Sequence, residues 1–405
     1  MAKKAAVKSS VRGPAKSSAR KAALKKAGGG GQSALSGLPA TVSINRAARP
    51  PVKRASASVS LEVIEGAGVG RAGRPSSLAA SARARGVGSM NGIDLLTLSD
   101  LTSSQILQLY KTAAAVKKDV GPYRRVLDGK TVVLLFEKAS LRTRISFETG
   151  INKLGGTSLY MDHSSQRIGE RESAKDYAKN LERWIDCIVA RVYSQRAVDD
   201  LALYAKIPVI NALSDRFHPC QGLADLFTLW ERPGSLDGVR LAWIGDGNNV
   251  CHSLMHAATL LGVDTTVVTP RGYQPSADVV DQCLTYAKDA GSMLTFSHDP
   301  AAIEGHHAVY TDVWVSMGQT DQANERRAAF ADYAVTPELM AVASRGLDEN
   351  KRFPDGSLFM HCLPAQRGVE VMDEVIDSPA SIVYDQAENR MHAQNALLIH
   401  LFGGG

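Results

Sequence analysis

The stretch TVVLLFEKASLRTRISFE, from Thr131 to Glu148, decides the fold class of this chain. Its first six residues are apolar or β-branched, which is typical of a buried strand. Ser140 is a preferred N-cap residue, so a helix is expected to begin there. A strand that leads within a few residues into a helix is the repeating unit of a parallel α/β sheet.

The same alternation of strands and helices recurs in two series along the chain. Strands are expected at residues 131–136, 158–161, 187–193 and 207–212, and then at 240–245, 265–269, 294–297, 308–312 and 358–363. Helices are expected between them, including 100–117, 173–184 and a long closing helix at about 386–401. The sequence therefore predicts an α/β protein with two doubly wound domains, each with a central parallel sheet flanked by helices, joined by long interdomain helices.

A domain boundary is expected near Glu231-Arg-Pro-Gly-Ser235, where Pro and Gly interrupt the pattern. This places one domain at residues 90–231 and a second at 232–385. The C-terminal helix, within 386–405, is expected to pack back on the first domain.

Charge is distributed unevenly over the 405 residues, whose formal net charge is +6. Residues 1–90 contain 17 Lys or Arg and only two acidic residues, whereas the rest contains 30 basic and 39 acidic residues. The basicity therefore belongs to a leader, and the part predicted to fold is acidic. For that part no nucleic-acid partner is expected.

The leader, residues 1–89, is rich in Ala, Ser, Gly, Lys and Arg, has no Phe, Trp or Tyr, and is predicted to be disordered. Its composition favours a transit peptide, for the plastid stroma ahead of the mitochondrial matrix. Two alternatives remain. The leader can contact nucleic acid through its lysines, or it can be a solvated extension without a function, in which case a cytoplasmic location follows.

The rest of the composition argues against a membrane span and against a disulfide framework. No apolar run reaches the roughly 18 residues that a span needs. The five cysteines are odd in number, scattered and never in a CxxC pair, which favours a reducing compartment and no structural zinc site.

Polar residues that follow the expected strands are the candidates for a site, because ligands of parallel sheets bind outside the carboxyl ends of the strands. Ser140, Arg142 and Thr143 follow the first strand, and a helix starting at Ser140 directs free N–H groups at an anion. Together they suit a phosphate. The alternative is an ordinary capped helix with a surface arginine paired to a glutamate, which is the role expected of Arg144.

Three further positions fit the same anion. Arg191 ends an apolar run, and a buried arginine needs an acidic partner or a phosphate. His218 and Gln221 flank a proline at a helix start, where both can bond a carbonyl. A structural ion pair and a structural histidine are the alternatives for Arg191 and His218.

The second series carries different chemistry. Gly245-Asp-Gly247-Asn-Asn249-Val250 resembles a dinucleotide fingerprint that lacks its third glycine, so nucleotide binding is not expected. Its amides suit an amino acid instead. Asp312 follows a strand and precedes the loop Ser316-Met317-Gly318, and His361-Cys362-Leu363-Pro364 ends another strand. A cleft between the two domains would hold a phosphate-bearing electrophile opposite an amine.

Four of these motifs together resemble a known family. Ser140-Leu-Arg-Thr-Arg144, His218-Pro-Cys-Gln221, Asp312 with Ser316-Met-Gly318, and His361-Cys-Leu-Pro364 occur in the order and spacing of the carbamoyltransferases. The similarity extends from about Ile93 to Phe402. The Asp-x-Trp-x-Ser-Met-Gly element resembles the ornithine branch of the aspartate/ornithine carbamoyltransferase family.

The resemblance implies a role for each matching residue. Those implied to bind carbamoyl phosphate are Ser140, Leu141, Arg142, Thr143, Gln166, Arg191, His218, Gln221, Cys362, Leu363 and Arg390. Those implied to bind ornithine are Asn249, Asp312, Ser316 and Met317. The implied catalytic residues are Arg142, His218, Asp312 and Cys362. Leu141 departs from the threonine of many members, but this position contributes mainly its backbone.

The implied reaction is transfer of the carbamoyl group from carbamoyl phosphate to L-ornithine, in arginine biosynthesis, without a metal or other cofactor. The first domain would bind carbamoyl phosphate and the second ornithine, in a homotrimer whose Gln166 loop reaches a neighbouring site. Aspartate is a poor acceptor for a Ser316-Met-Gly loop, whereas putrescine and N-acetylornithine remain alternatives. An alternative from another class is a nucleic-acid-associated protein that acts through the basic leader.

Overall fold

The computed structural model describes residues 90–315, 320–347, 353 and 356–403 of the chain. The predicted leader at 1–89 lies outside these residues, as do the two expected ornithine positions Ser316 and Met317.

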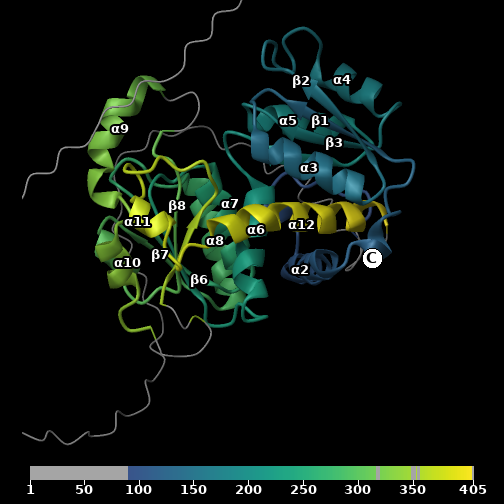
Figure 1. Cartoon of the computed structure of the whole chain (residues 1–405). Helices are drawn as coiled ribbons and strands as arrows, with labels where there is room; N and C mark the ends of the chain where they lie inside the picture. Colours follow the sequence, from purple (N-terminus) through teal and green to yellow (C-terminus); the bar gives the residue numbers. More distant parts are fainter. Residues whose placement is uncertain (1–89, 316–319, 348–352, 354–355, 404–405) are drawn as a thin grey trace, which may run out of the picture. The chain divides into compact units, whose positions relative to one another are not determined.

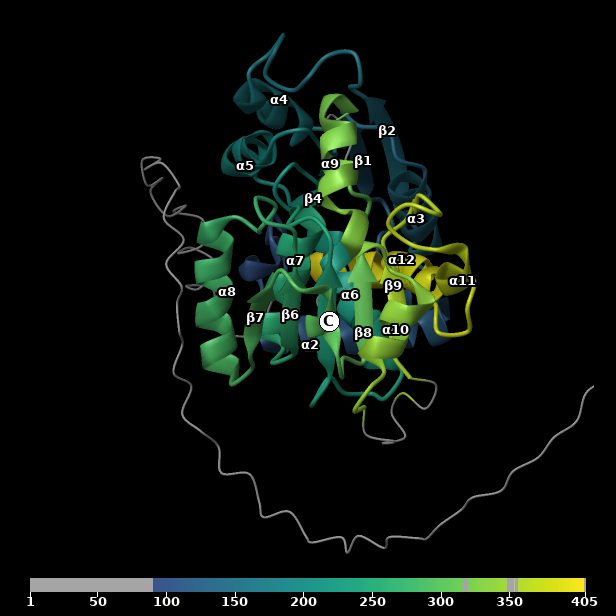
Figure 2. The same ribbon diagram turned by 90° about the vertical axis from the view of Figure 1, so that its left-hand side faces the viewer.

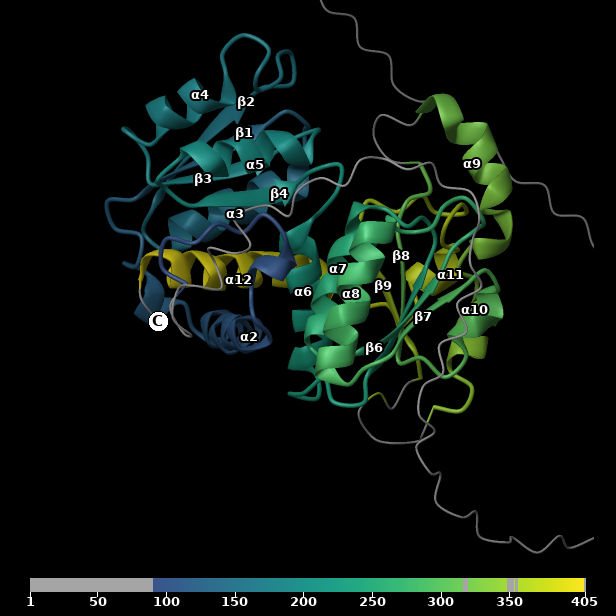
Figure 3. The ribbon, with the colours of Figure 1, turned by 180° about the vertical axis from the view of Figure 1, so that it is seen from behind.

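The first sheet contains four parallel strands in the order β2-β1-β3-β4. They are β1 (Thr131–Phe136), β2 (Thr157–Asp162), β3 (Cys187–Arg191) and β4 (Val209–Leu213). One face packs on α3 (Leu141–Lys153), and the other packs on α4 (Ala174–Leu181) and α5 (Gln195–Tyr204) (Figures 1 and 3). Because helices cover both faces, residues 132–136 of β1 are all buried, which explains the unbroken apolar run in the sequence.

The second sheet contains five parallel strands in the order β7-β6-β5-β8-β9, of which β7, β6, β8 and β9 are labelled in Figure 2. They are β5 (Arg240–Ile244), β6 (Asp264–Val268), β7 (Leu294–Ser297), β8 (Ala308–Thr311) and β9 (Leu358–His361). The helices α7 (Asn249–Leu260) and α8 (Ala277–Ala290) lie on one face (Figure 3). The other face carries α9 (Ala323–Ala329), α10 (Pro337–Ala343) and α11 (Asp373–Ile376). The predicted pair of parallel α/β sheets is therefore confirmed.

Two helices contact elements of both α/β series. The helix α6 (Pro219–Glu231) contacts β4 and α7, and α12 (Val383–Phe402) packs on α3, α6 and α2 (Ser103–Lys118) and contacts β9. Pro219 occupies the first turn of α6, where its missing N–H leaves no helical bond unmade. Among the described helices, none is long and apolar enough to cross a bilayer.

Short 3₁₀ turns complete the described secondary structure: η1 (Leu98–Asp100), η2 (Gly121–Tyr123), η3 (Pro300–Ile303), η4 (Thr320–Gln322) and η5 (Ala331–Tyr333). The helix expected from Asp100 is divided, because Asp100 closes a capping box with Thr97 and α2 begins separately after its own N-cap, Thr102. The last strand ends at His361, two residues earlier than expected. Leu363 has a φ of +57°, which is incompatible with continued extended backbone.

Candidate active site

Thr143 is the meeting point of three polar side chains at the start of α3. Ser140 is the N-cap, as predicted, and its hydroxyl donates to Thr143 Oγ1 at 3.0 Å. The same oxygen accepts from Arg390 Nη2 at 3.0 Å and lies 3.4 Å from Arg191 Nη1. The fold thus brings arginines from β3 and α12 to the helix N-terminus that follows β1.

These two arginines are buried, and neither forms an ion pair within the described part of the chain. Arg191 is 6% exposed and Arg390 3% exposed, and the Nε of each has no hydrogen-bond partner among the described residues. Burial lowers the pKa of both guanidinium groups, and the nearby cation of Arg142 lowers both further. Buried like charges are costly unless an anion joins them, so the cluster is suited to a phosphate.

Arg142 itself is only partly buried, and its neighbours have different surroundings. Leu141 is 74% exposed on the surface of α3. Arg144 pairs with Glu148 at 2.9 Å and lies 3.8 Å from the Tyr160 ring centroid. Arg144 therefore has the structural role expected for it, whereas Arg142 adds its charge to the buried cluster.

His218 and Gln221 lie at the start of α6, beside the arginines. The His218 backbone N–H donates to Ser253 Oγ at 2.7 Å, which ties α6 to α7. Burial, and then the charges of Arg390 and Arg191, hold the pKa of His218 well below its usual value of 6.5. The imidazole is therefore neutral at pH 7 and acts through hydrogen bonds. Its Nδ1 is buried and has no hydrogen-bond partner within the part of the chain that the structure describes.

Asp312 is the carboxylate of the opposite half of the site. It is 7% exposed, and it accepts from the Cys362 thiol at 3.0 Å and from Asn248 Nδ2 at 2.8 Å. Burial and Asp312 raise the pKa of Cys362 well above its usual value, so the thiol remains protonated and donates. Cys362 also interacts electrostatically with Arg191 and Arg390, which places it between the cations and Asp312.

The adjacent residues Asn248 and Asn249 make different contacts from those expected. Asn249, the expected ornithine ligand, donates through Nδ2 to the Ser214 carbonyl at 2.6 Å. Asn248 caps α7 and is the residue that contacts Asp312. The sequence signal for Asn248 was its place in the same motif, but residue type could not separate two adjacent asparagines.

Asp246 and Arg326 form a second charged pair near Asp312 that the sequence did not indicate. Arg326 Nη1 lies 3.0 Å from Asp246 Oδ2 and 3.0 Å from the Trp314 carbonyl. Burial raises the pKa of Asp246 to about 6; Arg326 opposes that rise and Asp312 adds to it. Two neighbouring buried carboxylates, only one of them paired with an arginine, favour a cationic ligand.

Asp312, His361 and Cys362 present donor atoms within 4.8 Å of one another, which is a metal-like grouping. However, His361 Nδ1 accepts from the Leu363 N–H at 2.9 Å, and Nε2 lies 3.3 Å from Glu370 Oε1. Both ring nitrogens are engaged, so a metal could bind the imidazole only by displacing one of these contacts. The grouping is better explained as support for the Cys362-Leu363 backbone.

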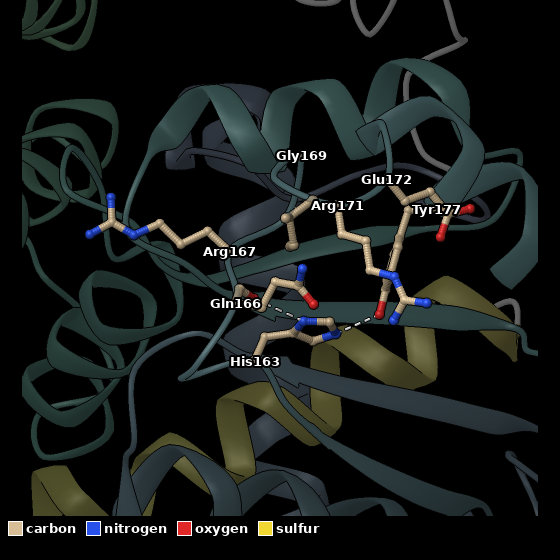
Figure 4. Close-up of a pocket in the computed structure, with 8 residues that line it drawn as sticks. His163, Gln166, Arg167, Gly169, Arg171, Glu172 and Tyr177 are labelled. Carbon is tan, nitrogen blue, oxygen red and sulfur yellow. Dashed lines mark hydrogen bonds between the residues drawn. The ribbon is translucent and has the colours of Figure 1, made fainter.

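Gln166 lies away from this cluster, on the loop between β2 and α4. It lines a pocket of about 310 Å³ with seven other residues: His163, Arg167, Ile168, Gly169, Arg171, Glu172 and Tyr177. Figure 4 shows His163 between the Gln166 backbone and the Tyr177 hydroxyl. Among the described residues, no hydrogen bond joins the Gln166 side chain to the Thr143 cluster.

The loop is held by a buried carboxylate that the sequence did not indicate. Glu137, directly after β1, accepts from the Ile168 N–H at 2.8 Å and from the Tyr193 N–H at 2.7 Å. This one side chain joins the Gln166 loop to the ends of β1 and β3.

Comparisons with known proteins agree with this arrangement. Residues 94–231 match the aspartate/ornithine carbamoyltransferase, carbamoyl-P binding domain, and residues 237–401 match the Asp/Orn binding domain of the same family. A protein named ornithine carbamoyltransferase from Shewanella oneidensis is 48% identical over 307 residues, covering 76% of this chain and 98% of that protein. One from Pyrococcus furiosus, named as anabolic, is 46% identical over 319 residues, covering 78% of this chain and 98% of that protein.

The solved structures agree as well. The structure titled ornithine carbamoyltransferase from Pyrococcus furiosus superimposes with a TM-score of 0.73 at 46% identity, covering 79% of this chain and 100% of that one. Both halves of the described chain are accounted for by these matches, and the chain belongs to the aspartate/ornithine carbamoyltransferase family.

Proposed function

We propose that the chain transfers the carbamoyl group of carbamoyl phosphate to L-ornithine, releasing L-citrulline and phosphate, as a step of arginine biosynthesis. The observation that carries this proposal is the cluster of Arg142, Arg191 and Arg390, which forms no ion pair among the described residues and lies near Asp312 through Cys362. A phosphate compensates the cations, and an ammonium group compensates the carboxylate. The names of the relatives support the same pair of substrates.

The two substrates are assigned to the two sheets. Residues 90–231, completed by Arg390 from α12, would bind carbamoyl phosphate. The reason is that Arg191 and Arg390 both contact Thr143 there. Residues 232–385 would bind ornithine, because Asp312 lies at the end of β8 beside Asn248. The remaining expected ligands, Ser316 and Met317, would complete the ornithine side.

In the proposed reaction the neutral δ-amine of ornithine attacks the carbamoyl carbon. A C–N bond forms, the carbonyl oxygen becomes negatively charged, and the tetrahedral intermediate collapses as the C–O bond to phosphate breaks. The phosphate leaves with the electron pair and accepts the proton that the amine loses. Atoms and charges balance without a metal or an organic cofactor.

The cluster supplies what each step needs. Arg142, Thr143 and neutral His218 would donate to the oxyanion, a type of contact for which loss of one donor typically costs about 2.7–4 kcal/mol of transition-state stabilisation. Ser140, Arg142, Arg191 and Arg390 would bind the leaving phosphate. Because the arginines are already in place and desolvated, little reorganisation is required when charge develops.

The ornithine side is proposed to recognise charge. Asp312 would bind the α-ammonium group, with Cys362 and Asn248 holding the carboxylate in position through their hydrogen bonds. Asn249 would contribute its amide oxygen, since its Nδ2 already donates to the Ser214 carbonyl. The strained Leu363, at φ +57°, would present its backbone to the carbamoyl group.

We also propose that the chain forms a homotrimer in which Gln166 acts in a neighbouring site. Support comes from apolar side chains exposed beside the cluster: Leu141 (74%) and Ile145 (50%) on α3, and Leu159 (48%) on the edge strand β2. Sedimentation velocity tests this, because a trimer of the 43.3 kDa chain has three times the mass of a monomer. A monomer at working concentration would refute it.

For location, we propose that residues 1–89 target the chain to an organelle, the plastid stroma ahead of the mitochondrial matrix. Fluorescent-protein fusions of residues 1–89 test this, and diffuse cytoplasmic signal would contradict it. The competing nucleic-acid role predicts salt-sensitive DNA binding that is lost when the chain starts at Met90. We expect the shortened chain to keep full transferase activity.

Citrulline-type product formation, assayed with L-ornithine, putrescine and N-acetylornithine, tests the substrate assignment. We expect L-ornithine to have the highest kcat/KM, since putrescine lacks the α-carboxylate and N-acetylornithine lacks the α-ammonium that faces Asp312. Preference for either analogue would move the assignment to that acceptor. No product from any of the three would refute the proposed function.

A further inference from the structure

A buried carboxylate, Asp225, accepts a hydrogen bond from a residue of the candidate site, Gln221. Asp225 lies one turn after Gln221 on α6 and is fully buried. Its Oδ1 accepts from Gln221 Nε2 at 2.7 Å. The amide nitrogen of Gln221 is therefore turned toward Asp225, and Oε1, on the other side of the amide, is buried without a hydrogen-bond partner in the described ranges.

The carboxylate is held from a second helix. Gln386 of α12 donates through Nε2 to the same Oδ1 at 2.6 Å, and its own Oε1 accepts from the His361 backbone N–H at 3.0 Å. The contacts form a continuous path from Gln221 through Asp225 and Gln386 to the strand end beside Cys362. Because Oδ1 accepts two bonds from different helices, Asp225 cannot rotate without breaking both.

This acceptor role of Oδ1 does not depend on ionisation. Burial raises the pKa of Asp225 to about 7, with the two glutamine contacts opposing that rise. When a proton binds, it binds to Oδ2, because Oδ1 already accepts two hydrogen bonds, and Oδ1 remains an acceptor. Gln221 therefore keeps its orientation on both sides of neutral pH.

Gln221 Oε1 is a hydrogen-bond acceptor among side chains that mostly donate. Arg191, Arg390 and the Thr143 cluster supply hydrogen-bond donors, which suit the phosphate and carbonyl oxygens of the proposed substrate. The carbamoyl NH₂ group is itself a donor and needs an acceptor. Gln221 Oε1 is a buried acceptor that can receive its hydrogen bond. The sequence alone predicts that Gln221 bonds the carbonyl oxygen of the substrate, but the orientation of its side chain suits the carbamoyl NH₂ group instead.

We propose that Asp225 is a positioning residue that fixes the Gln221 amide so that Oε1 receives the carbamoyl NH₂, and thereby selects carbamoyl phosphate against acyl phosphates. The inference rests on the proposed function and extends it to the origin of donor specificity. Acetyl phosphate carries a methyl group where carbamoyl phosphate carries NH₂, so it leaves Oε1 unpaired in a buried site. A site built to bond a donor rejects the analogue that lacks it.

The test uses the full chain and acetyl phosphate as a competitive inhibitor of citrulline formation. The quantity to measure is the ratio of the acetyl phosphate Ki to the carbamoyl phosphate KM. We expect Asp225→Ala and Gln221→Leu each to lower this ratio by roughly three- to tenfold, the typical effect of one hydrogen bond. The double variant should lower it no further, because both changes remove the same contact.

Asp225→Asn is the conservative control, because its amide oxygen can still accept from both glutamines, so its ratio should stay near that of the unmodified chain. One contrary outcome is that Asp225→Ala lowers kcat and leaves the Ki/KM ratio unchanged, while Gln221→Leu lowers that ratio. In that case Asp225 has only a structural role and the inference is wrong. An unchanged ratio in Gln221→Leu refutes the acceptor role itself.

Two further outcomes are distinguishable. If Asp225→Ala does not fold, Gln386→Leu takes its place, since it releases the carboxylate from α12, and an unchanged ratio in that variant counts against the inference. If the unmodified chain forms no citrulline, the proposed function has failed, and not the role of Asp225.

Discussion

Thr143 Oγ1 lies 3.0 Å from Arg390 Nη2, although 247 positions separate the two residues in the chain. The contact joins the first turn of α3 to α12, the helix that also reaches β9 of the second sheet. Through it, the cation cluster depends on the packing of α12 and not only on the motif around Ser140.

Arg142→Ala should lower kcat by about 10²–10³-fold, the typical effect of removing one oxyanion donor. Arg144→Ala is the matched control two residues away. Arg144 pairs with Glu148 on the surface, and such exposed pairs contribute about 0–1 kcal/mol. Steady-state citrulline kinetics distinguish the two variants. Equal losses, or an Arg142→Ala kcat near that of the unmodified chain, would contradict the assignment.

Inorganic phosphate should raise the melting temperature of the chain, because an anion relieves the repulsion among Arg142, Arg191 and Arg390. At a concentration of 100 Kd, binding stabilises the native state by about 2.7 kcal/mol. Thermal melts with increasing phosphate measure the shift. Arg191→Met should abolish it, whereas Arg196→Met, at an exposed ion pair on α5, should preserve it. A shift that survives Arg191→Met would place the phosphate elsewhere.

Asp312→Asn should raise the KM for L-ornithine by tenfold or more, roughly the effect of weakening a charged hydrogen bond, while changing the KM for carbamoyl phosphate much less. The reason is that Asp312 is proposed to bind the second substrate, whereas the arginines are proposed to bind the first. Varying each substrate at saturation of the other separates the two constants. Comparable increases in both would argue against the division of the site between the two sheets.

The free energy of unfolding should fall as the pH is lowered from 7.5 to 5.0. Burial lowers the pKa of His256 to about 3, so the unfolded chain, with an ordinary pKa near 6.5, binds the proton first. A histidine whose folded pKa is depressed contributes stability that is present above about pH 6.5 and lost below it. For this one group the expected loss is about 2 kcal/mol over that range.

Urea denaturation of the unmodified chain and of His256→Leu, at both pH values, measures this contribution. The variant should lose about 2 kcal/mol less on acidification. It will keep some acid sensitivity, because burial also lowers the pKa of His218 and His252. An identical pH dependence in both chains would show that His256 is not the group responsible.

Much of the fold followed from local pattern. The apolar run at 131–136, the Ser140 cap and the alternation after it depend on neighbours within a few positions, and β1 and α3 begin where they were expected. Two element boundaries differ from the prediction because of backbone geometry. Asp100 ends a separate 3₁₀ turn, and the positive φ of Leu363 shortens the last strand.

The site could be predicted as a set of residue types but not as a set of contacts. Arg191, His218 and Asp312 follow strands, so their general location came from the rule for parallel sheets. The roles of Asn248, Asp225 and Arg326 could not be predicted, because each depends on a partner 64, 161 or 80 positions away. Whether two such residues meet depends on the rotation and spacing of packed helices, which hydrophobic period does not specify.

The sequence by itself determined the two α/β series, the helix that begins after Ser140 and the motifs that mark the family, because strand pattern, capping and motif order are properties of short segments. Only the tertiary structure decided that Arg191 and Arg390 share Thr143, that Asn248 contacts Asp312, and that Gln386 of α12 contacts Asp225 of α6. Those contacts join separate elements, and they are settled when α6 and α12 pack and exclude water from the charges between them.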